Sequence, residues 1–454
     1  MVTFLPLGGA DEIGANCYYL NINGSGIILD CGMHPKKTGL DALPKFELLE
    51  NKALDYILIS HAHQDHINAL PFLIKKFPHL KIVTTPQTRA IAELTLHNAI
   101  SILEQQIEDK SLSIYSHDEV DLLIKSIEYK SYNDQFDITG LKAAHGSVVT
   151  AEFYDAGHVL GSAEILIKYD DKKIFYSGDI NLSSQSILNG ASLPNLKVKT
   201  IVLECTYGAT DSSKLRQWED EIDIFVSSLN NIINRGGSVL IPAFSLGKMQ
   251  EILTTIYTRM EMGKLTRADI YTGGIGKKIS RIYDYNRYVV NRKEIELILH
   301  DVPQKSIFDI NSTEDLFKYP SIIIASSGMM IESTVSFTLT KRWLTQGGSA
   351  IFTVGYMDED TPGYKVAKAK KGDNIKLTDT EKEVNVLCDI NNFNFSAHSK
   401  REELLEIIKR LNPDNVVLIH GDPEAIDWVG ASIIKMNKKI KVYTAGINKE
   451  LLFD

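Results

Sequence analysis

The sequence predicts an α/β protein built from two domains, one of them inserted into the other. Short β-branched runs near both ends of the chain pass directly into polar or glycine-rich loops, whereas the middle alternates helical and strand patterns. At 454 residues the chain is also too long for one ordinary domain. We expect residues 1–207 and 391–454 to form one domain and residues 208–390 to form the insertion.

Five runs in the first part of the chain are typical of buried strands that end in loops. They are IILDCG (27–32), YILISHAHQDH (56–66), EFYDAGHVLGS (152–162), KIFYSGD (173–179) and TIVLECTYG (200–208). Strands covered on both faces are almost continuously apolar. Functional side chains collect in the loops at the ends of such strands, so we expect a site there.

The middle segment has the pattern of a parallel, doubly wound sheet. Apolar residues at helical spacing predict a helix from Trp218 to Ile232, and a second helix is expected at about 247–260. Strands are expected at 238–244, 319–330 and 349–356. Alternation of this kind is typical of helices packed on a parallel sheet. The strand-to-loop form returns after residue 390, in NFNFSAHS and VVLIHGD.

Composition excludes several classes of protein. The net charge of −9 gives no general attraction to nucleic acid, so any such contact must be local. The four cysteines form no CxxC pair, which argues against disulfides or a structural zinc site. Neither a signal peptide nor a run of about 18 apolar residues is present, so we expect a soluble, cytoplasmic protein without a membrane segment.

Ligand-type side chains are concentrated directly after the strand at 56–59. This one tight loop holds His61, His63, Asp65 and His66. Imidazole nitrogen and carboxylate oxygen are donors that Zn²⁺ favours. One loop cannot complete two coordination shells, so partners are expected in the other strand-end loops, namely His158, Asp179 and, behind a ligand histidine, Asp30.

Four motifs together resemble those of proteins with the metallo-β-lactamase fold. In chain order they are LDCG, HAHQDH, AGHVLGSA and SGD. That fold is an αββα sandwich with two metals at one edge. The resemblance implies two Zn²⁺ per chain, the first held by His61, His63 and His158 and the second by Asp65 and His66. Asp179 would bridge both ions.

Further segments resemble the β-CASP group of this superfamily, whose members process nucleic acids. LECTYG, FSAHS and VVLIHGD place Glu204, His398 and His420 on the group's three motifs. IPAFSLGKMQEIL, IASSGMM and FTVGY resemble segments of the inserted β-CASP α/β domain. RNA-acting members resemble one another in having histidine at the position of His420, where it would complete the second metal's shell. RNA is therefore the expected substrate.

The expected activity is zinc-dependent hydrolysis of phosphodiester bonds within single-stranded RNA. Two zinc ions share a water, lower its pKa, and neutralise charge on the phosphate oxygens. Asp65 belongs to this catalytic centre. His398 is suited to protonate the leaving oxygen because the ordinary pKa of a histidine side chain lies near neutrality, and Glu204 would orient it.

Three alternative functions stay open at this point. The nearest is a 5′→3′ exoribonuclease like ribonuclease J, although members of that family typically carry a further C-terminal domain. A non-catalytic RNA-binding scaffold and a small-molecule hydrolase are the others, and the presence of Glu204, His398 and His420 argues against the hydrolase. The resemblance also allows a homodimer and RNA-processing partners, but no sequence feature requires either.

Candidate RNA contacts lie mainly in the insertion. Lys248 occupies a position where family members often carry arginine, and lysine attracts phosphate as a point charge. Ser396 precedes His398 by two residues. Lys277 and Lys278 lie in GGIGKKIS, which lacks the spacing of a phosphate-binding P-loop, so we expect them to line an RNA groove instead.

Overall fold

The computed structural model describes residues 2–106 and 115–453, which form two compact units. The first unit comprises Met1–Ser183, Gly190–Ser212 and His398–Asp454, and the second comprises Ser184–Asn189 and Ser213–Ala397. Residues 391–397 therefore lie in the second unit, whereas the sequence pattern assigned them to the first. The reason is that the strand Asp389–Phe393 pairs in parallel with Ala350–Val354 of the second unit.

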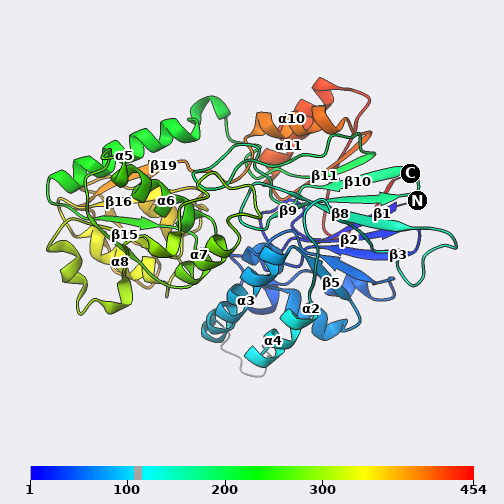
Figure 1. The fold of residues 1–454 in the computed structure, drawn as a ribbon, viewed down its shortest axis with the longest axis horizontal. Coiled ribbons are helices and arrows are strands. Elements are labelled where there is room, and N and C mark those ends of the chain that lie inside the picture. The colour runs from blue at the N-terminus through cyan, green and yellow to red at the C-terminus, as the bar shows by residue number, and fades with distance from the viewer. Residues whose placement is uncertain (1, 107–114, 454) are drawn as a thin grey trace. The chain divides into compact units, whose positions relative to one another are not determined.

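Two seven-stranded sheets form the centre of the first unit (Figure 1). One sheet has the order β22 (Leu451–Phe453), β1 (Val2–Gly8), β2 (Cys17–Ile22), β3 (Ser25–Leu29), β4 (Tyr56–Leu58), β5 (Lys81–Thr84) and β6 (Glu128–Tyr129). The other has the order β21 (Lys441–Thr444), β20 (Asn415–Ile419), β11 (Thr200–Glu204), β10 (Lys172–Tyr176), β9 (Ala163–Tyr169), β8 (Val149–Asp155) and β7 (Gln135–Asp137).

Helices cover the outer face of each sheet, which gives four layers. The helices of this unit are α1 (Gln64–Ile67), α2 (Leu70–Lys76), α3 (Pro86–Gln106), α4 (His117–Ser126), α10 (Arg401–Leu411) and α11 (Pro423–Met436). In β9, Ile165 and Ile167 pack between the sheets, whereas Leu166 packs toward α10 and α11. On the other side, Ile28 and Ile57 pack with Leu73 and Leu96 of α2 and α3. The predicted αββα sandwich is confirmed.

The strands direct the sequence motifs to one edge of the sandwich. In the first sheet β3 and β4 are parallel, and in the second sheet β10, β11 and β20 are parallel. Asp30, His61, Asp179 and His420 all follow the carboxyl end of one of these strands, and Glu204 is the last residue of β11. Loops at the carboxyl ends of strands in α/β proteins are the usual place for a binding site.

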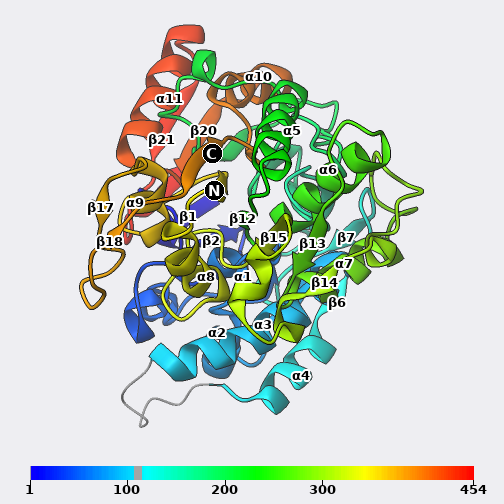
Figure 2. The ribbon, with the colours of Figure 1, turned by 90° about the vertical axis from the view of Figure 1, so that its left-hand side faces the viewer.

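The second unit is an α/β layer structure, shown from another side in Figure 2. Its parallel sheet has the order β14 (Lys305–Ser306), β13 (Asp269–Thr272), β15 (Ser321–Ala325), β12 (Val239–Pro242), β16 (Ala350–Val354) and β19 (Asp389–Phe393). Its helices are α5 (Trp218–Asn234), α6 (Lys248–Glu261), α7 (Gly276–Tyr285), α8 (Val335–Leu344) and α9 (Pro362–Lys368), and β17 (Asn374–Ile375) pairs with β18 (Val384–Asn385). The predicted parallel α/β insertion is confirmed.

The helices of this unit pack on both faces of its sheet. Trp343 of α8 packs with Leu240 and Ile323 on one face. Residues 322 and 324 of β15 point to the opposite face because side chains alternate along a strand, and α6 also contacts β15. None of the helices in the described ranges is long and apolar enough to cross a bilayer. The four cysteines are buried and free.

Glu164 on β9 provides a test of the packing of the first unit. Its side chain is fully buried, and among the described residues neither carboxylate oxygen has a hydrogen-bond partner. Burial, and then the charge of Asp155, raise the pKa of Glu164 well above 4.5. The protonated side chain therefore favours the fold, and stability is lost as the pH rises from about 4.5 through the raised pKa.

We expect Glu164→Gln to stabilise the protein at pH 8 by about 1–3 kcal/mol, because it removes a charge that has no partner. At pH 4 the difference from the native chain should be small. The thermal unfolding midpoint measured at both pH values checks this, with the exposed Glu128→Gln as the matched control. An equal effect at the two pH values would contradict the assignment.

Candidate metal centre

The loop that follows β4 is fixed by backbone hydrogen bonds rather than by regular structure. The amide of Cys31 donates to the carbonyl of His66 (2.8 Å), and the amide of Asn16 donates to the carbonyl of Asp65 (2.9 Å). Asp65 and His66 lie on the short helix α1, and the amide of His66 donates to the carbonyl of His63 (3.0 Å). The loop is therefore held against the segments that flank β2 and β3, and its side chains project from a rigid backbone.

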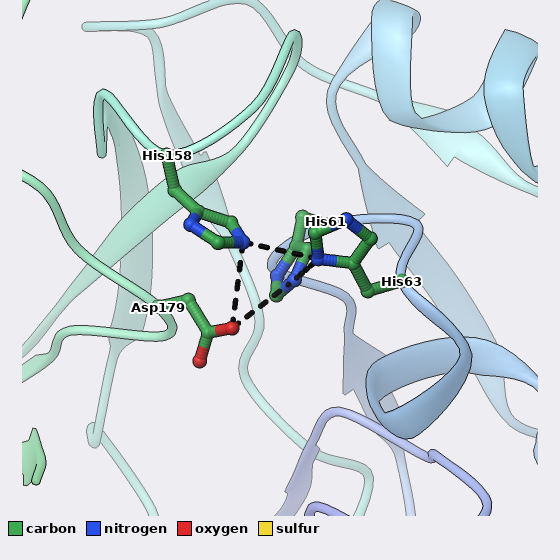
Figure 3. A group of neighbouring side chains, drawn as sticks. All are labelled: His61, His63, His158 and Asp179. Atoms are coloured by element: carbon green, nitrogen blue, oxygen red, sulfur yellow. Dashed lines mark hydrogen bonds and ion pairs between the residues drawn. The ribbon is translucent and has the colours of Figure 1, made fainter. Parts of the chain in front are cut away.

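The first donor group contains His61, His63, His158 and Asp179 (Figure 3). His63 Nδ1 lies 3.1 Å from His61 Nε2 and 3.0 Å from His158 Nε2. Asp179 Oδ2 lies 3.5 Å from the same two Nε2 atoms. Tetrahedral zinc with bonds of about 2.0–2.1 Å has ligand–ligand edges of about 3.3–3.4 Å. The donor set and its spacing therefore fit one such ion.

The second donor group contains Asp65, His66 and His420. Asp65 Oδ2 lies 3.3 Å from His420 Nε2 and 3.7 Å from His66 Nε2. His420 reaches this position from the end of β20 with a left-handed backbone (φ 48°), a conformation that costs energy for a residue other than glycine. Strain of this kind persists where surrounding structure holds a side chain in place for function.

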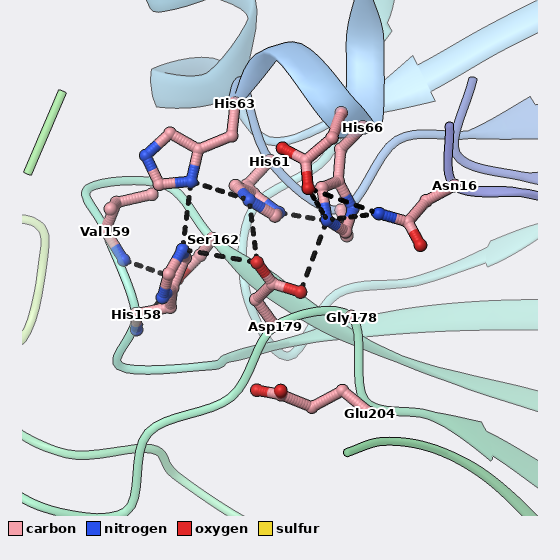
Figure 4. Close-up of polar contacts among 12 residues, drawn as sticks. Asn16, His61, His63, His66, His158, Val159, Ser162, Gly178, Asp179 and Glu204 are labelled. Atoms are coloured by element: carbon pink, nitrogen blue, oxygen red, sulfur yellow. Dashed lines mark hydrogen bonds and ion pairs between the residues drawn. The ribbon is translucent and has the colours of Figure 1, made fainter. Parts of the chain in front are cut away.

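Asp179 joins the two groups, because each of its carboxylate oxygens faces one of them (Figure 4). Oδ2 faces the first group, whereas Oδ1 lies 3.2 Å from His66 Nε2 and 3.0 Å from His420 Nδ1. Among the described residues, Oδ1 is buried and accepts no hydrogen bond. A buried carboxylate oxygen flanked by two ring nitrogens is a position that a cation would satisfy.

The turn that carries Asp179 requires glycine at residue 178. Gly178 has a positive φ of 51°, and a Cβ atom there would lie 2.9 Å from the Cβ of Ser60. Any larger residue would therefore push the SGD turn away from the loop that carries His61. The glycine of this motif thus sets the distance between Asp179 and its histidine neighbours.

Asp30 lies behind His66. Its Oδ2 lies 2.8 Å from His66 Nδ1 and accepts hydrogen bonds from Tyr176 (2.5 Å) and the Ser60 hydroxyl (2.7 Å). Its Oδ1 accepts from the Ser60 amide (2.6 Å). With Nδ1 of His66 held in this way, Nε2 is the ring atom that faces the donor group.

His398 and Glu204 form a pair beside the first donor group. His398 Nδ1 lies 3.0 Å from Glu204 Oε1, and His398 Nε2 lies 4.0 Å from Asp179 Oδ2. The amides of Ile180 and Thr206 donate to the two oxygens of Glu204 (2.9 and 3.1 Å), which fixes the carboxylate. Burial lowers the pKa of His398, but the carboxylates of Glu204 and Asp179 outweigh burial and raise it.

The charges of the buried donors depend on one another. Burial, and then the charge of His66, lower the pKa of His61 well below its usual value. Burial also opposes protonation of His66 and His420, but carboxylates led by Asp179 outweigh it and raise both pKa values, that of His420 to about 10. Without a cation these carboxylates draw protons onto the imidazoles. A metal ion would displace those protons, because only neutral imidazole is a ligand.

Three contacts of the site were not predicted from the sequence. The amide nitrogen of Asn16 lies 2.9 Å from His66 Nε2, and its carbonyl oxygen accepts from the Tyr18 hydroxyl (2.7 Å). An asparagine before β2 has no ligand-type spacing, so nothing in the sequence marks it. Ser60 and Tyr176 lie in the motifs SHAH and YSGD. Both motifs occur at the carboxyl end of a strand, and this position could have marked the two residues as part of the site.

The four residues expected to contact RNA all belong to the second unit, whereas the donor groups belong to the first. Lys248 is buried, donates to the Phe395 carbonyl, and lies 5.1 Å above the ring of Trp218. Burial lowers its pKa to about 8. Ser396 and Lys277 are half-buried, and Lys278 is exposed on α7.

Comparison with protein families agrees with this combination of fold and donor groups. Three family models match the chain: a metallo-beta-lactamase superfamily domain over residues 19–207, a Beta-Casp domain over 236–366, and a Zn-dependent metallo-hydrolase RNA specificity domain over 383–445. The chain belongs to the β-CASP group of the metallo-β-lactamase superfamily. Family and donor set together indicate a divalent-metal site.

Relatives from several eukaryotes are similar along nearly the whole chain. "Cleavage and polyadenylation specificity factor 73" of Drosophila melanogaster is 31% identical over 426 residues, covering 92% of this chain and 59% of that protein. "Cleavage and polyadenylation specificity factor subunit 3" of Dictyostelium discoideum is 30% identical over 451 residues (97% and 56%). "Endoribonuclease YSH1" of Saccharomyces cerevisiae is 26% identical over 455 residues (96% and 57%). The chain spans less than two thirds of the length of these relatives.

A crystal structure of a protein of unknown function from Enterococcus faecalis V583 has a similar fold. Its TM-score is 0.59 with 14% sequence identity, and the match covers 100% of both chains. At this identity the likeness concerns the fold alone.

We expect Asp30→Asn to weaken metal binding by about 10–100-fold, because the hydrogen-bonded carboxylate that orients His66 is lost. Metal content after dialysis against graded concentrations of a chelator, measured by elemental analysis, checks this. The exposed Asp171→Asn is the matched control and should retain native metal content. Equal metal retention by the two variants would show that Asp30 does not support the site.

Proposed function

We propose that the chain is a zinc-dependent ribonuclease that hydrolyses phosphodiester bonds within single-stranded RNA, with two Zn²⁺ at the donor groups. The observation that carries this proposal is the position of Asp179, whose two oxygens each face one donor group. In the proposal, the first ion takes His61, His63 and His158, and the second takes Asp65, His66 and His420. Asp179 belongs to both shells.

The residues around the donor groups suit cleavage of a phosphodiester. When bound, a pair of zinc ions supplies a hydroxide at neutral pH and positive charge beside the phosphate oxygens. His398 directs Nε2 toward the same region, since Glu204 holds its Nδ1. The raised pKa of His398 favours the protonated form, which can donate a proton to the leaving oxygen.

RNA is the substrate class that the relatives favour. Their names include an endoribonuclease and subunits of a cleavage and polyadenylation specificity factor, and one matching family model is described as an RNA specificity domain. Cleavage within the strand, partner proteins in RNA processing and a cytoplasmic location belong to the same proposal. A 5′→3′ exonuclease is the alternative that the test must separate.

The test uses internally labelled single-stranded RNA whose 5′ end is either monophosphorylated or blocked. Zinc-loaded protein should release internal fragments from both substrates, and His61→Ala with His63→Ala should abolish the activity and lower the zinc content. The exposed pair His145→Ala with His300→Ala is the matched control. Mononucleotides released only from the unblocked RNA would support the exonuclease instead. A chain that binds no zinc under any condition would refute the proposal.

We expect Glu204→Gln to lower the cleavage rate by about 100-fold or more with unchanged zinc content. A neutral amide no longer favours the charged form of His398, and its NH₂ group must face the backbone amide of either Ile180 or Thr206, since these donate to different oxygens of Glu204. Single-turnover rates and elemental analysis on the same preparation check this, with the exposed Glu424→Gln as control. Loss of zinc together with activity would instead make Glu204 part of the metal shell.

A further inference from the structure

We propose that one exposed face of α7 in the second unit is a docking surface for single-stranded RNA. The surface, here called the α7 strip, consists of Lys278, Arg281, Tyr285 and Tyr288. The inference rests on the proposed function, because it names where the substrate would be held outside the site of cleavage.

The four residues lie on one side of the helix. Their spacings of three, four and three residues repeat the helical period, with Tyr288 in the turn just after the helix ends. The opposite face is packed, since Ile279 and Tyr283 are fully buried. From Lys278 to Tyr285, the last residue of the helix, the strip rises about 10.5 Å at 1.5 Å per residue. The helix is therefore anchored on one side and presents basic and aromatic groups on the other.

The cations of the strip have no acidic partners. Among the described residues, neither Lys278 nor Arg281 forms an ion pair, nor does the adjacent Lys277. Ion pairs are common elsewhere in the unit, as in Arg259–Glu219 and Lys341–Glu381. A chain with a net charge of −9 can attract a polyanion only where cations are gathered and left unpaired. The basic half of the strip meets that condition.

The aromatic half of the strip is unusually exposed. Tyr285 is 84% exposed and Tyr288 66% exposed, and the guanidinium of Arg287 lies 4.5 Å from the ring of Tyr288. Flat rings beside cations are the arrangement on which unpaired bases stack while phosphates are neutralised. A duplex hides its bases, so the aromatic half favours a single strand. A purely apolar protein partner would leave Lys278 and Arg281 without a role.

The test measures binding of a fluorescein-labelled 20-nucleotide oligouridylate to the full chain by fluorescence anisotropy, with Glu204→Gln present in every protein to slow cleavage. Lys278→Ala with Arg281→Ala should weaken binding about 10-fold at low salt. It should also reduce the slope of log K against log salt by about 1.4, or about 0.7 per lost phosphate contact. Tyr285→Ala with Tyr288→Ala should weaken binding similarly while leaving the slope unchanged.

Matched controls come from exposed residues of the same unit outside the strip. Lys264→Ala with Arg267→Ala removes two cations from the segment before β13. Tyr319→Ala removes one exposed ring, which lies just after Leu316 and Phe317, two residues that pack in the same cluster as Trp343 of α8. Neither should change binding by more than twofold. Effects of the controls equal to those of the strip variants would overturn the proposal, because binding would then be diffuse.

The outcomes separate this inference from the proposed nuclease activity. In the chain with native Glu204, the strip variants should raise KM for the 20-nucleotide RNA without changing kcat, so cleavage itself persists. Unchanged affinity of both strip variants, with cleavage intact, would overturn the α7 strip and leave the nuclease standing. An equal loss of affinity for duplex and single-stranded RNA would also overturn it, because stacking on the tyrosines would then have no part.

Discussion

The carboxylate of Asp179 is the interaction on which the arrangement of the site depends. Its two oxygens lie close to donor side chains from both sheets. His61 and His66 follow β4 of the first sheet, and His420 follows β20 of the second. A carboxylate buried among ring nitrogens is unfavourable by itself, since burial alone would raise its pKa. The nearby histidines reverse that effect and hold the pKa well below its usual value. The edge of the sandwich is therefore stable only as a balanced set of charges.

The rest of the first unit serves to hold this set in place. Asp30 sits at the end of β3 with a positive φ of 59° and takes hydrogen bonds from Ser60 and Tyr176, which come from different sheets. The amides of Ile180 and Thr206 fix Glu204 in the same way. His66 and Glu204 are thus each held in position by hydrogen-bonding partners. Side chains held like this lose little conformational entropy when an ion binds.

Much of this architecture was predictable because strand ends and donor side chains leave local signals. The run HAHQDH marks a site by itself, and the alternation between Gly208 and residue 390 indicates the parallel sheet. What could not be predicted depends on contacts that are distant in sequence. Asn16 reaches His66 across 50 positions, and Lys248 turns its ammonium group onto the Phe395 carbonyl across 147. The pairing of β19 with β16 extends the second unit to Ala397 for the same reason.

The insertion of one unit into the other also affects the order in which the site can be assembled. His398 and Glu204 are 194 positions apart, and His420 follows Asp179 by 241 positions. At about 5–20 residues per second of synthesis, roughly 12–50 s separate the emergence of Asp179 from that of His420. During this interval His61, His63, His158 and Asp179 have been made, whereas the second donor group is incomplete. On the ribosome, then, every residue of the first donor group is present well before the last residue of the second donor group has been made.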